Sequence, residues 1–408
     1  RGGAGGDAPP PPAPRAKLLL MMSETEPPTV QANLLVQLVT DCIVAVVSSL
    51  YRLLPEAEGG APGAPEGPRD AVSDGRAAPA QGQCKALLAE CWWSLAAALC
   101  SLLRGAADEL FLQSVLRCFQ TLTYCCSRQG LAFATKSCLQ QLASYALPGH
   151  GHESDADLTR PGGSGVGSLT PKNVLCLRAM LWTCHSHGGF LGKAGWTVAL
   201  RAFASADRIL QRADASHGAE AADLKQALDA VFGSTATLTA SALGDVVAAM
   251  HEVVRGTELA DGVSLLSRLV ELCGCNLGRL LVVWQAVLAL VTDLCASDER
   301  AELRVAAAES LCKILLHRDA LVMQGDGDVG QAQTQLLQHL DGLLLVPHED
   351  ARRCVCEGLH DILQQSGHDL QPAAWGTVVD LVATAARAEL ERAGHGFAHP
   401  KIREPDAP

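Results

Sequence analysis

Residues 84–104, CKALLAECWWSLAAALCSLLR, carry apolar side chains at intervals of three and four along the chain. This interval is the period of an α-helix, so the stretch predicts a helix with an apolar face. A helix of this length is marginal in water on its own, because tertiary packing supplies most of the stability of helices in proteins. We therefore expect the segment to be one member of a larger helical assembly.

The same period recurs on both sides of this stretch. No alternating Val, Ile and Thr run flanks a two-residue Gly or Asn turn, so a sheet is not expected. Only a few residues separate successive helices, which favours antiparallel hairpins of about 40 residues, the plan of HEAT and armadillo repeats. The sequence thus predicts an all-α fold, an α-solenoid of HEAT/armadillo-like hairpins. The further helices are expected at 31–54, 108–128, 133–146, 172–187, 195–212, 221–232, 239–255, 262–274, 277–296, 299–317, 331–345, 350–365 and 372–393.

Breaks in composition divide the chain. Stretches rich in Gly, Ala and Pro cannot bury enough apolar surface to offset chain entropy and are expected to be disordered. The predicted parts are a disordered segment at 1–30, a helix at 31–54, a disordered linker at 55–83, a first helical block at 84–147, a flexible linker at 148–171, a second helical block at 172–393 and a tail at 394–408.

Size and charge narrow the class of protein. The chain has 408 residues, and a single core rarely grows beyond about 250–300 residues, which again favours an extended array. A net charge of −12 argues against nucleic acid as a ligand, because phosphate binding needs clustered Lys and Arg. Since the first residue is Arg1 and not Met, we expect the chain to be a fragment.

Sixteen cysteines are present, and most fall inside apolar helical runs, not in the regular framework of a small secreted domain. Reduced, buried thiols of a cytosolic protein are therefore expected. Residues 34–54 are the one stretch long enough to suggest a membrane span. Because Gln37, Thr40, Asp41 and Arg52 interrupt it, we expect a buried amphipathic helix instead.

The sequence CHSHGG places Cys184, His185 and His187 close together. A structural zinc site needs four ligands, and no second pair lies at a suitable spacing, so no metal is expected. Gly188 or Gly189 is predicted to end the helix in the left-handed conformation.

Other patterns also lack the partners that chemistry requires. The pairs Cys273/Cys275 and Cys354/Cys356 diverge on a helix. The stretch GGSGVGS at 162–168 has no preceding strand and no Lys, so it reads as a linker. No catalytic residue, cofactor or small-molecule substrate is expected. The tryptophans are predicted to fill the core between hairpins, with a partner-binding groove as the alternative: Trp92, Trp93, Trp182, Trp196, Trp284 and Trp375.

Three stretches, at 89–148, 172–200 and 269–295, together resemble the large Arf-type guanine-nucleotide exchange factors. Within that family the chain is most similar to the Mon-two (monensin-sensitivity) branch, which lacks the exchange domain. The spacing His185-x-His187-Gly188 and the low-complexity break before residue 84 support this branch. The residues that carry the resemblance are Lys172, Asn173, His185, His187, Gly188, Leu191, Gly192, Trp196, Asn276, Arg279 and Trp284.

The resemblance implies a non-enzymatic scaffold of vesicle-mediated protein transport between endosomes and the trans-Golgi network. It further implies a cytoplasmic protein, peripheral on those membranes, that works with Dopey-type scaffolds, aminophospholipid flippases and Arf-like GTPases. The motif residues are then structural and not catalytic. Two alternatives stay open: the non-catalytic regulatory arm of a large Arf exchange factor, and another HEAT-type adaptor.

Overall fold

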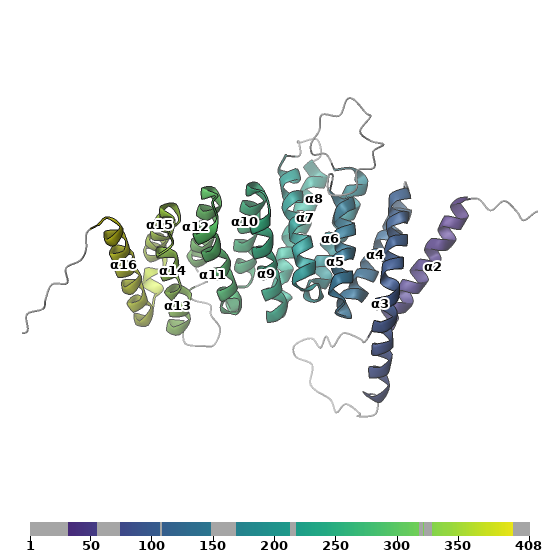
Figure 1. Cartoon of the computed structure of the whole chain (residues 1–408), viewed down its shortest axis with the longest axis horizontal. Coiled ribbons are helices and arrows are strands. Elements are labelled where there is room, and N and C mark those ends of the chain that lie inside the picture. Colours follow the sequence, from purple (N-terminus) through teal and green to yellow (C-terminus); the bar gives the residue numbers. More distant parts are fainter. Residues whose placement is uncertain are drawn as a thin grey trace, which may run out of the picture.

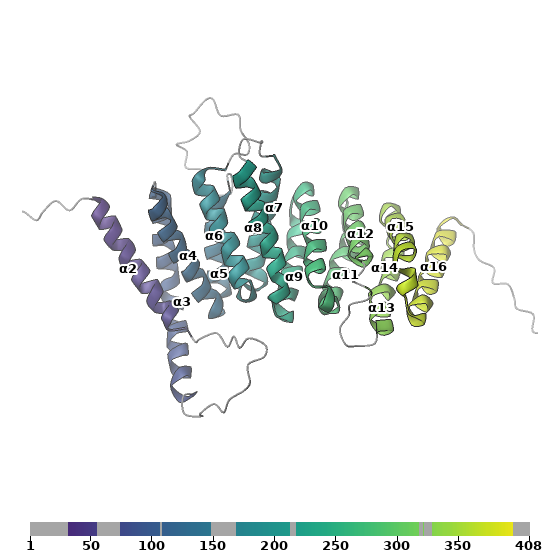
Figure 2. The same ribbon diagram turned by 180° about the vertical axis from the view of Figure 1, so that it is seen from behind.

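A computed structural model describes residues 32–54, 74–106, 108–147, 169–212, 218–317, 321 and 329–394. Its helices stand side by side in one long row, with α2 at one end and α16 at the other, as Figures 1 and 2 show from opposite sides. No strand occurs in these residues. The predicted all-α solenoid is confirmed.

The row consists of two layers, and each helix packs on the next helix of its own layer. One layer holds α2 (Ala32–Arg52), α4 (Glu109–Arg128), α6 (Pro171–His187), α8 (Gly218–Ser234), α10 (Leu259–Cys275), α12 (Ala301–Leu316) and α15 (Glu349–Ser366). The other layer holds α3 (Asp74–Gly105), α5 (Ala132–Ala146), α7 (Gly192–Arg212), α9 (Ala240–Gly256), α11 (Leu280–Ser297), α13 (Val329–Gln338), α14 (Leu340–Leu344) and α16 (Pro372–Arg392). A continuous apolar core runs between the layers.

Local capping residues fix where several helices begin. The Asp108 carboxylate accepts the Phe111 N–H at 2.8 Å before α4. Thr239 accepts the Ala242 N–H at 3.3 Å before α9. These bonds satisfy amides that have no partner inside the helix.

Two buried arginines fasten neighbouring repeats in the C-terminal half. Arg304 of α12 donates to the Asp298 carbonyl at 2.9 Å and pairs with Asp350 at the start of α15. Arg352 of α15 donates to the Val346 carbonyl at 2.9 Å and pairs with Glu389 of α16 at 2.7 Å. Each arginine lies near the start of its helix. Each one caps a turn and reaches the next helix with charge-assisted bonds.

Two predicted boundaries are wrong. Helix α3 begins at Asp74, inside the segment 55–83 that was expected to be disordered, because a composition rich in Ala and Gln also favours helix. The single helix predicted at 331–345 is divided at His339 into α13 and α14. The predicted disordered segment 1–30 lies outside the described residues. So do residues 148–168 of the predicted flexible linker and residues 395–408 of the predicted tail.

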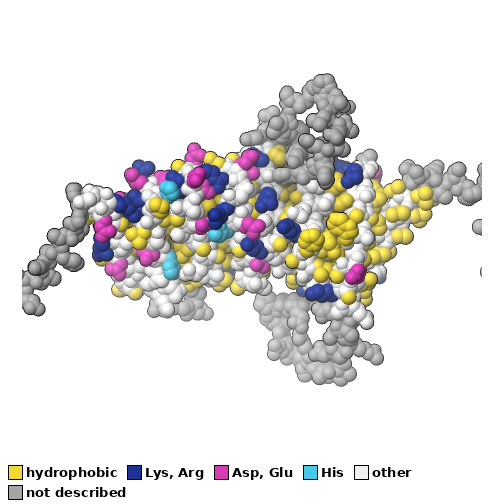
Figure 3. Space-filling view, viewed as in Figure 1, with side chains coloured by type: hydrophobic (Ala, Val, Ile, Leu, Met, Phe, Trp, Pro, Cys, Tyr) yellow, Lys and Arg dark blue, Asp and Glu magenta, His cyan; other side chains and the backbone are white. Residues whose placement is uncertain are grey.

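The expectation that residues 34–54 form a buried helix is also wrong. Helix α2 packs on α4 and, less extensively, on α3. Its buried residues form one stripe, Thr40, Ile43, Val47 and Leu50, and most of its other side chains are exposed in the described chain. Figure 3 shows hydrophobic side chains gathered over the end of the solenoid that holds α2 and α3, whereas charged side chains cover much of the rest of that face. The large exposed apolar residues of α2 and the turn after it are Leu34, Leu35, Val36, Leu38, Val39, Val46, Tyr51 and Leu53.

By length and composition alone, three helical stretches of the described chain are apolar enough to cross a membrane: Leu34–Arg52, Gly82–Gly105 and Leu277–Ser297. The third is 50% buried within the solenoid, against 17% and 28% for the first two. The high hydropathy of α11 is therefore explained by its place in the core, whereas α2 and α3 keep apolar surface exposed.

Gly358 of α15 packs closely against α12. A Cβ atom added there would lie 2.1 Å from the Cys312 Sγ of α12. We expect Gly358→Ala to lower the free energy of unfolding by about 1–3 kcal/mol, because the core must open to admit the methyl group. Gly376 of α16 has nothing within 4 Å of such an atom, so Gly376→Ala is expected to stabilise by about 0.5–1 kcal/mol. Denaturant unfolding that gives both variants the same sign would contradict this packing.

Candidate functional site

The most specific motif, His185 to Trp196, forms the turn between α6 and α7. The indole Nε1 of buried Trp196 donates to the Gly188 carbonyl at 3.0 Å. A Cβ atom at Gly188 would lie 2.8 Å from the Trp196 ring, so the glycine is required for close packing. The left-handed residue is Gly192, with φ +61, and the prediction of Gly188 or Gly189 is wrong, because a 3-10 turn, Gly188–Phe190, continues the chain first.

Lys172 and Asn173 join the start of α6 to two earlier helices. Asn173 completes a capping box with Thr170 and donates through Nδ2 to the Tyr145 carbonyl at 2.8 Å. Lys172 Nζ donates to the Arg104 carbonyl at 3.3 Å and lies over the Tyr145 ring. Both residues therefore hold the first helical block against the second.

Asn276 and Arg279 tie the turn after α10 to the turn after α8. Asn276 donates to Thr235 Oγ1 at 3.0 Å and accepts from Arg279 Nε at 2.9 Å. Arg279 also donates to the carbonyls of Thr235, at 2.7 Å, and Leu238. Arg279 thus satisfies backbone carbonyls at a turn that lies outside the regular helices, and it links that turn to its own.

Trp284 lies buried in α11, and its indole Nε1 has no acceptor among the described residues. Leu191 is buried beside the first motif. Apart from exposed His185 and the turn residue Gly192, the motif residues are thus packed or bonded within the solenoid.

The cysteines do not form a reactive or metal-binding site in the described chain. All sixteen are free thiols, most of them buried. Burial raises the pKa of Cys176 and Cys273 to about 12, so these thiols stay protonated at neutral pH. Cys184 is buried while His185 is exposed, and no three metal-binding side chains meet among the described residues.

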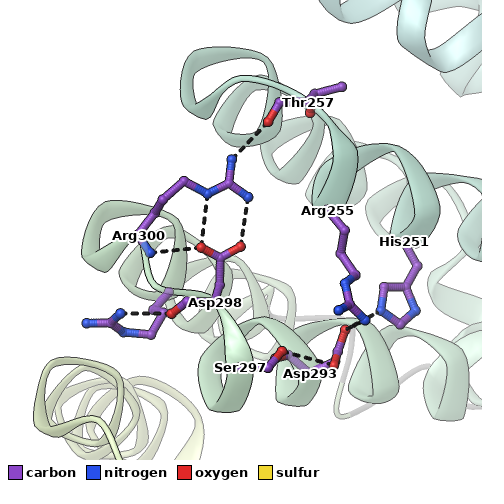
Figure 4. Close-up of polar contacts among 8 residues, drawn as sticks. His251, Arg255, Thr257, Asp293, Ser297, Asp298 and Arg300 are labelled. Atoms are coloured by element: carbon purple, nitrogen blue, oxygen red, sulfur yellow. Dashed lines mark hydrogen bonds and ion pairs between the residues drawn. The ribbon is translucent and has the colours of Figure 1, made fainter.

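One polar cluster escaped the sequence analysis, because its members lie on α9 and α11 (Figure 4). His251 Nε2 lies 2.8 Å from Asp293 Oδ2, and Arg255 donates to the same oxygen at 2.9 Å. Partial burial acts to raise the pKa of Asp293, but hydrogen bonds from His251 and Ser297 and the Arg255 charge lower it overall. Ser297 donates to Asp293 and not to His251, so the cluster is not a nucleophile and base; it links two helices.

Figure 4 also shows hydrogen bonds that join the turn after α11 to the turn after α9. Arg300 donates to both Asp298 oxygens, at 2.9 and 2.7 Å, and to the Thr257 carbonyl at 2.9 Å. The hydrogen bonds from Arg300 lower the pKa of Asp298 despite its partial burial. No sequence signal marks these contacts, because Arg300 and Thr257 are 43 residues apart.

An aromatic groove of about 700 Å³ lies on the layer of α2, α4 and α6. Tyr124 lies at its centre, with ring centroids 5.7 Å from Tyr51 and 4.2 Å from His187. Trp182 stacks edge-on against His187 at 5.1 Å and is 50% exposed. We define the aromatic groove by the side chains Tyr51, Arg117, Tyr124, Arg178, Trp182 and His187.

The prediction that the tryptophans fill the core is therefore right for only part of the set. Trp196 and Trp284 are buried, whereas Trp93, Trp182 and Trp375 are exposed. Partial burial lowers the pKa of His187. A backbone hydrogen bond acts in the opposite direction, but the net change is a lowered pKa. The imidazole is then neutral at pH 7 and contributes to the groove as another aromatic ring.

The structure defines a helical-repeat protein with surface grooves, and its described residues hold no cluster of three His, Cys, Asp or Glu side chains that could bind a metal ion. No family model matches the chain. The resemblance seen in the sequence is confirmed: the chain is similar to Protein MON2 homolog of Xenopus laevis, with 24% identity over 89% of this chain and 26% of the relative. Protein MON2 homolog of Homo sapiens is also 24% identical, over 72% of this chain and 21% of the relative. The chain thus spans about a quarter of the length of the curated relatives it matches.

Two solved structures align with most of the chain. One is an engineered protein, with 12% identity and a TM-score of 0.25 over 84% of both chains. The other is SYS-1, with 12% identity and a TM-score of 0.23 over 85% of this chain and 61% of that chain. Scores this low carry no argument about function.

Proposed function

We propose that this chain is part of a non-enzymatic scaffold of vesicle-mediated transport between endosomes and the trans-Golgi network. The observation that carries the proposal is the similarity to Protein MON2 homolog along 89% of the chain. A solenoid suits the role, because stacked hairpins offer extended surfaces to several partners at once. The protein is expected on the cytoplasmic side of those membranes as a peripheral component.

The proposal extends to partners of the kinds that the resemblance implies: a Dopey-type scaffold, an aminophospholipid flippase and an Arf-like GTPase. The aromatic groove and the exposed apolar side chains of α2 are surfaces that protein partners could cover. No nucleic acid or small-molecule substrate is proposed.

Deleting the gene is expected to disturb retrieval of endosomal cargo to the Golgi, and a tagged copy of the protein should lie on both membranes. Cargo retrieval is measured by antibody uptake of a cycling receptor, with re-expression of the untagged protein as the control. A nuclear location combined with normal retrieval in the deletion would contradict the proposal. Nucleotide exchange on an Arf-like GTPase by the purified chain would favour the exchange-factor alternative.

A further inference from the structure

The aromatic groove has the features of a side-chain recognition site. Helices α4 and α6 form its walls, and Gln120 closes the floor by donating to the Ala179 carbonyl at 2.9 Å. Tyr51 of α2 and Trp182 of α6 stand at the rim, each about half exposed. Clustered, partly exposed aromatic side chains are typical of protein interfaces, where they supply most of the binding energy.

The dimensions of the groove fit a short helix. Its lining residues on α4 run from Gln113 to Tyr124, a span of about 16 Å at the rise of an α-helix. A ligand helix of about three turns would cover that length. Since the backbone amides within α4 and α6 are already bonded inside these helices, recognition must come from side chains, as when an amphipathic helix lies in an apolar groove.

The charge of the groove selects the ligand further. Two arginines, Arg117 and Arg178, line it, and no Asp or Glu does, although the chain as a whole carries a net charge of −12. Arg117 makes no ion pair within the described chain, and Arg178 faces Asp223 at 3.8 Å with both side chains exposed. Such an exposed pair contributes little, so a ligand carboxylate can displace Asp223 and bind in bidentate fashion.

We propose that the aromatic groove binds an acidic amphipathic helix of a partner protein, with aromatic or leucine side chains on its apolar face and Asp or Glu at the edges. The anchors would pack on Tyr124, His187 and Trp182, and the carboxylates would pair with Arg117 and Arg178. This inference deepens the proposed scaffold function and rests on it, because it names the kind of partner segment that the scaffold holds.

The test uses the whole chain and a fluorescein-labelled, capped peptide of about 16 residues, with Leu and Trp at helical spacing and Glu at the flanking positions. Fluorescence anisotropy is expected to show saturable binding. Trp182→Ala and the double variant Arg117→Glu/Arg178→Glu should each weaken it by about tenfold or more. A peptide with Lys in place of every Glu should bind the charge-reversed variant better than the wild type.

Matched controls separate the groove from the rest of the surface. Trp93→Ala removes another exposed tryptophan, on α3, and Arg201→Glu/Arg353→Glu reverses two exposed arginines outside the groove. Both are expected to leave binding unchanged. Equal binding of the Glu and Lys peptides, or equal loss in control and groove variants, would overturn the proposal. The proposal would also be overturned if the protein bound phosphatidylserine vesicles and not the peptide, and if the groove variants lost that vesicle binding.

A cellular comparison distinguishes this inference from the proposed function. If the wild-type protein restores cargo retrieval in deleted cells and Arg117→Glu/Arg178→Glu restores it equally well, the groove inference is wrong and the transport role stands. If the deletion leaves retrieval normal while the peptide still binds the groove, the transport role is wrong instead. Restoration by the wild type but not by the groove variant supports both.

Discussion

Trp196→Ala is expected to lower the free energy of unfolding by about 3–5 kcal/mol, the usual cost of emptying a large buried aromatic position. The Trp196 indole is 1% exposed and bonds to the Gly188 carbonyl in the turn between α6 and α7. Its loss would remove packing and also the hydrogen bond from the indole N–H to that carbonyl. Urea unfolding followed by circular dichroism measures the change.

Trp93→Ala is the control for this prediction, because Trp93 is 62% exposed on α3. We expect a change within about 0.5 kcal/mol, as for most surface substitutions. Should Trp196→Ala prove as mild as Trp93→Ala, the buried position of the indole would be wrong.

Arg268→Ala is expected to lower the free energy of unfolding by about 3–5 kcal/mol, because it leaves the buried Asp207 carboxylate without its cation. The side chains of Arg268 and Asp207 are only 7% and 10% exposed, and two bonds of 3.0 and 3.2 Å join them. Arg268 also pairs with Asp229 and Glu271. Burial acts to lower the pKa of Arg268, but the hydrogen bonds to these carboxylates raise it overall.

A double variant tests whether the stability lost in Arg268→Ala comes from the unpaired buried charge of Asp207. Arg268→Met combined with Asp207→Leu removes both charges, and we expect it to recover much of the stability lost in Arg268→Ala. Lys313→Ala breaks an exposed pair with Glu309 on α12 and should cost less than about 0.5 kcal/mol. If Arg268→Ala is as harmless as Lys313→Ala in thermal and urea unfolding, the buried ion pair contributes nothing to the fold.

The helical plan could be predicted because the period of apolar residues is a local property of the chain. Helices α4, α5 and α15 lie within one or two residues of their predicted bounds. Errors occurred where the local signal was ambiguous: the Ala-rich start of α3, the break at His339, and the choice of Gly192 over Gly188 for the left-handed turn. In each case two conformations fit the same residues.

The candidate site was only partly predictable. The motifs at Asn173, Gly188 and Asn276 were found in the sequence, but their bonds to Tyr145, Trp196 and Thr235 were not. The aromatic groove needed Tyr51, Tyr124 and Trp182 from three helices to meet. No pairwise spacing along the chain encodes such a meeting.

The apolar stripes at helical period are enough to predict a row of packed helices, because such stripes must be buried against each other. Which stripes are covered follows from the packing of the helices in three dimensions. Trp196 and Trp182 both lie in helices and are each followed by Thr in the sequence, yet Trp196 is buried and Trp182 is exposed. The apolar helix α2 keeps most of its surface exposed at the end of the row. An apolar stripe favours burial against some neighbour, but the stacking of helices distant in sequence sets which neighbour covers it.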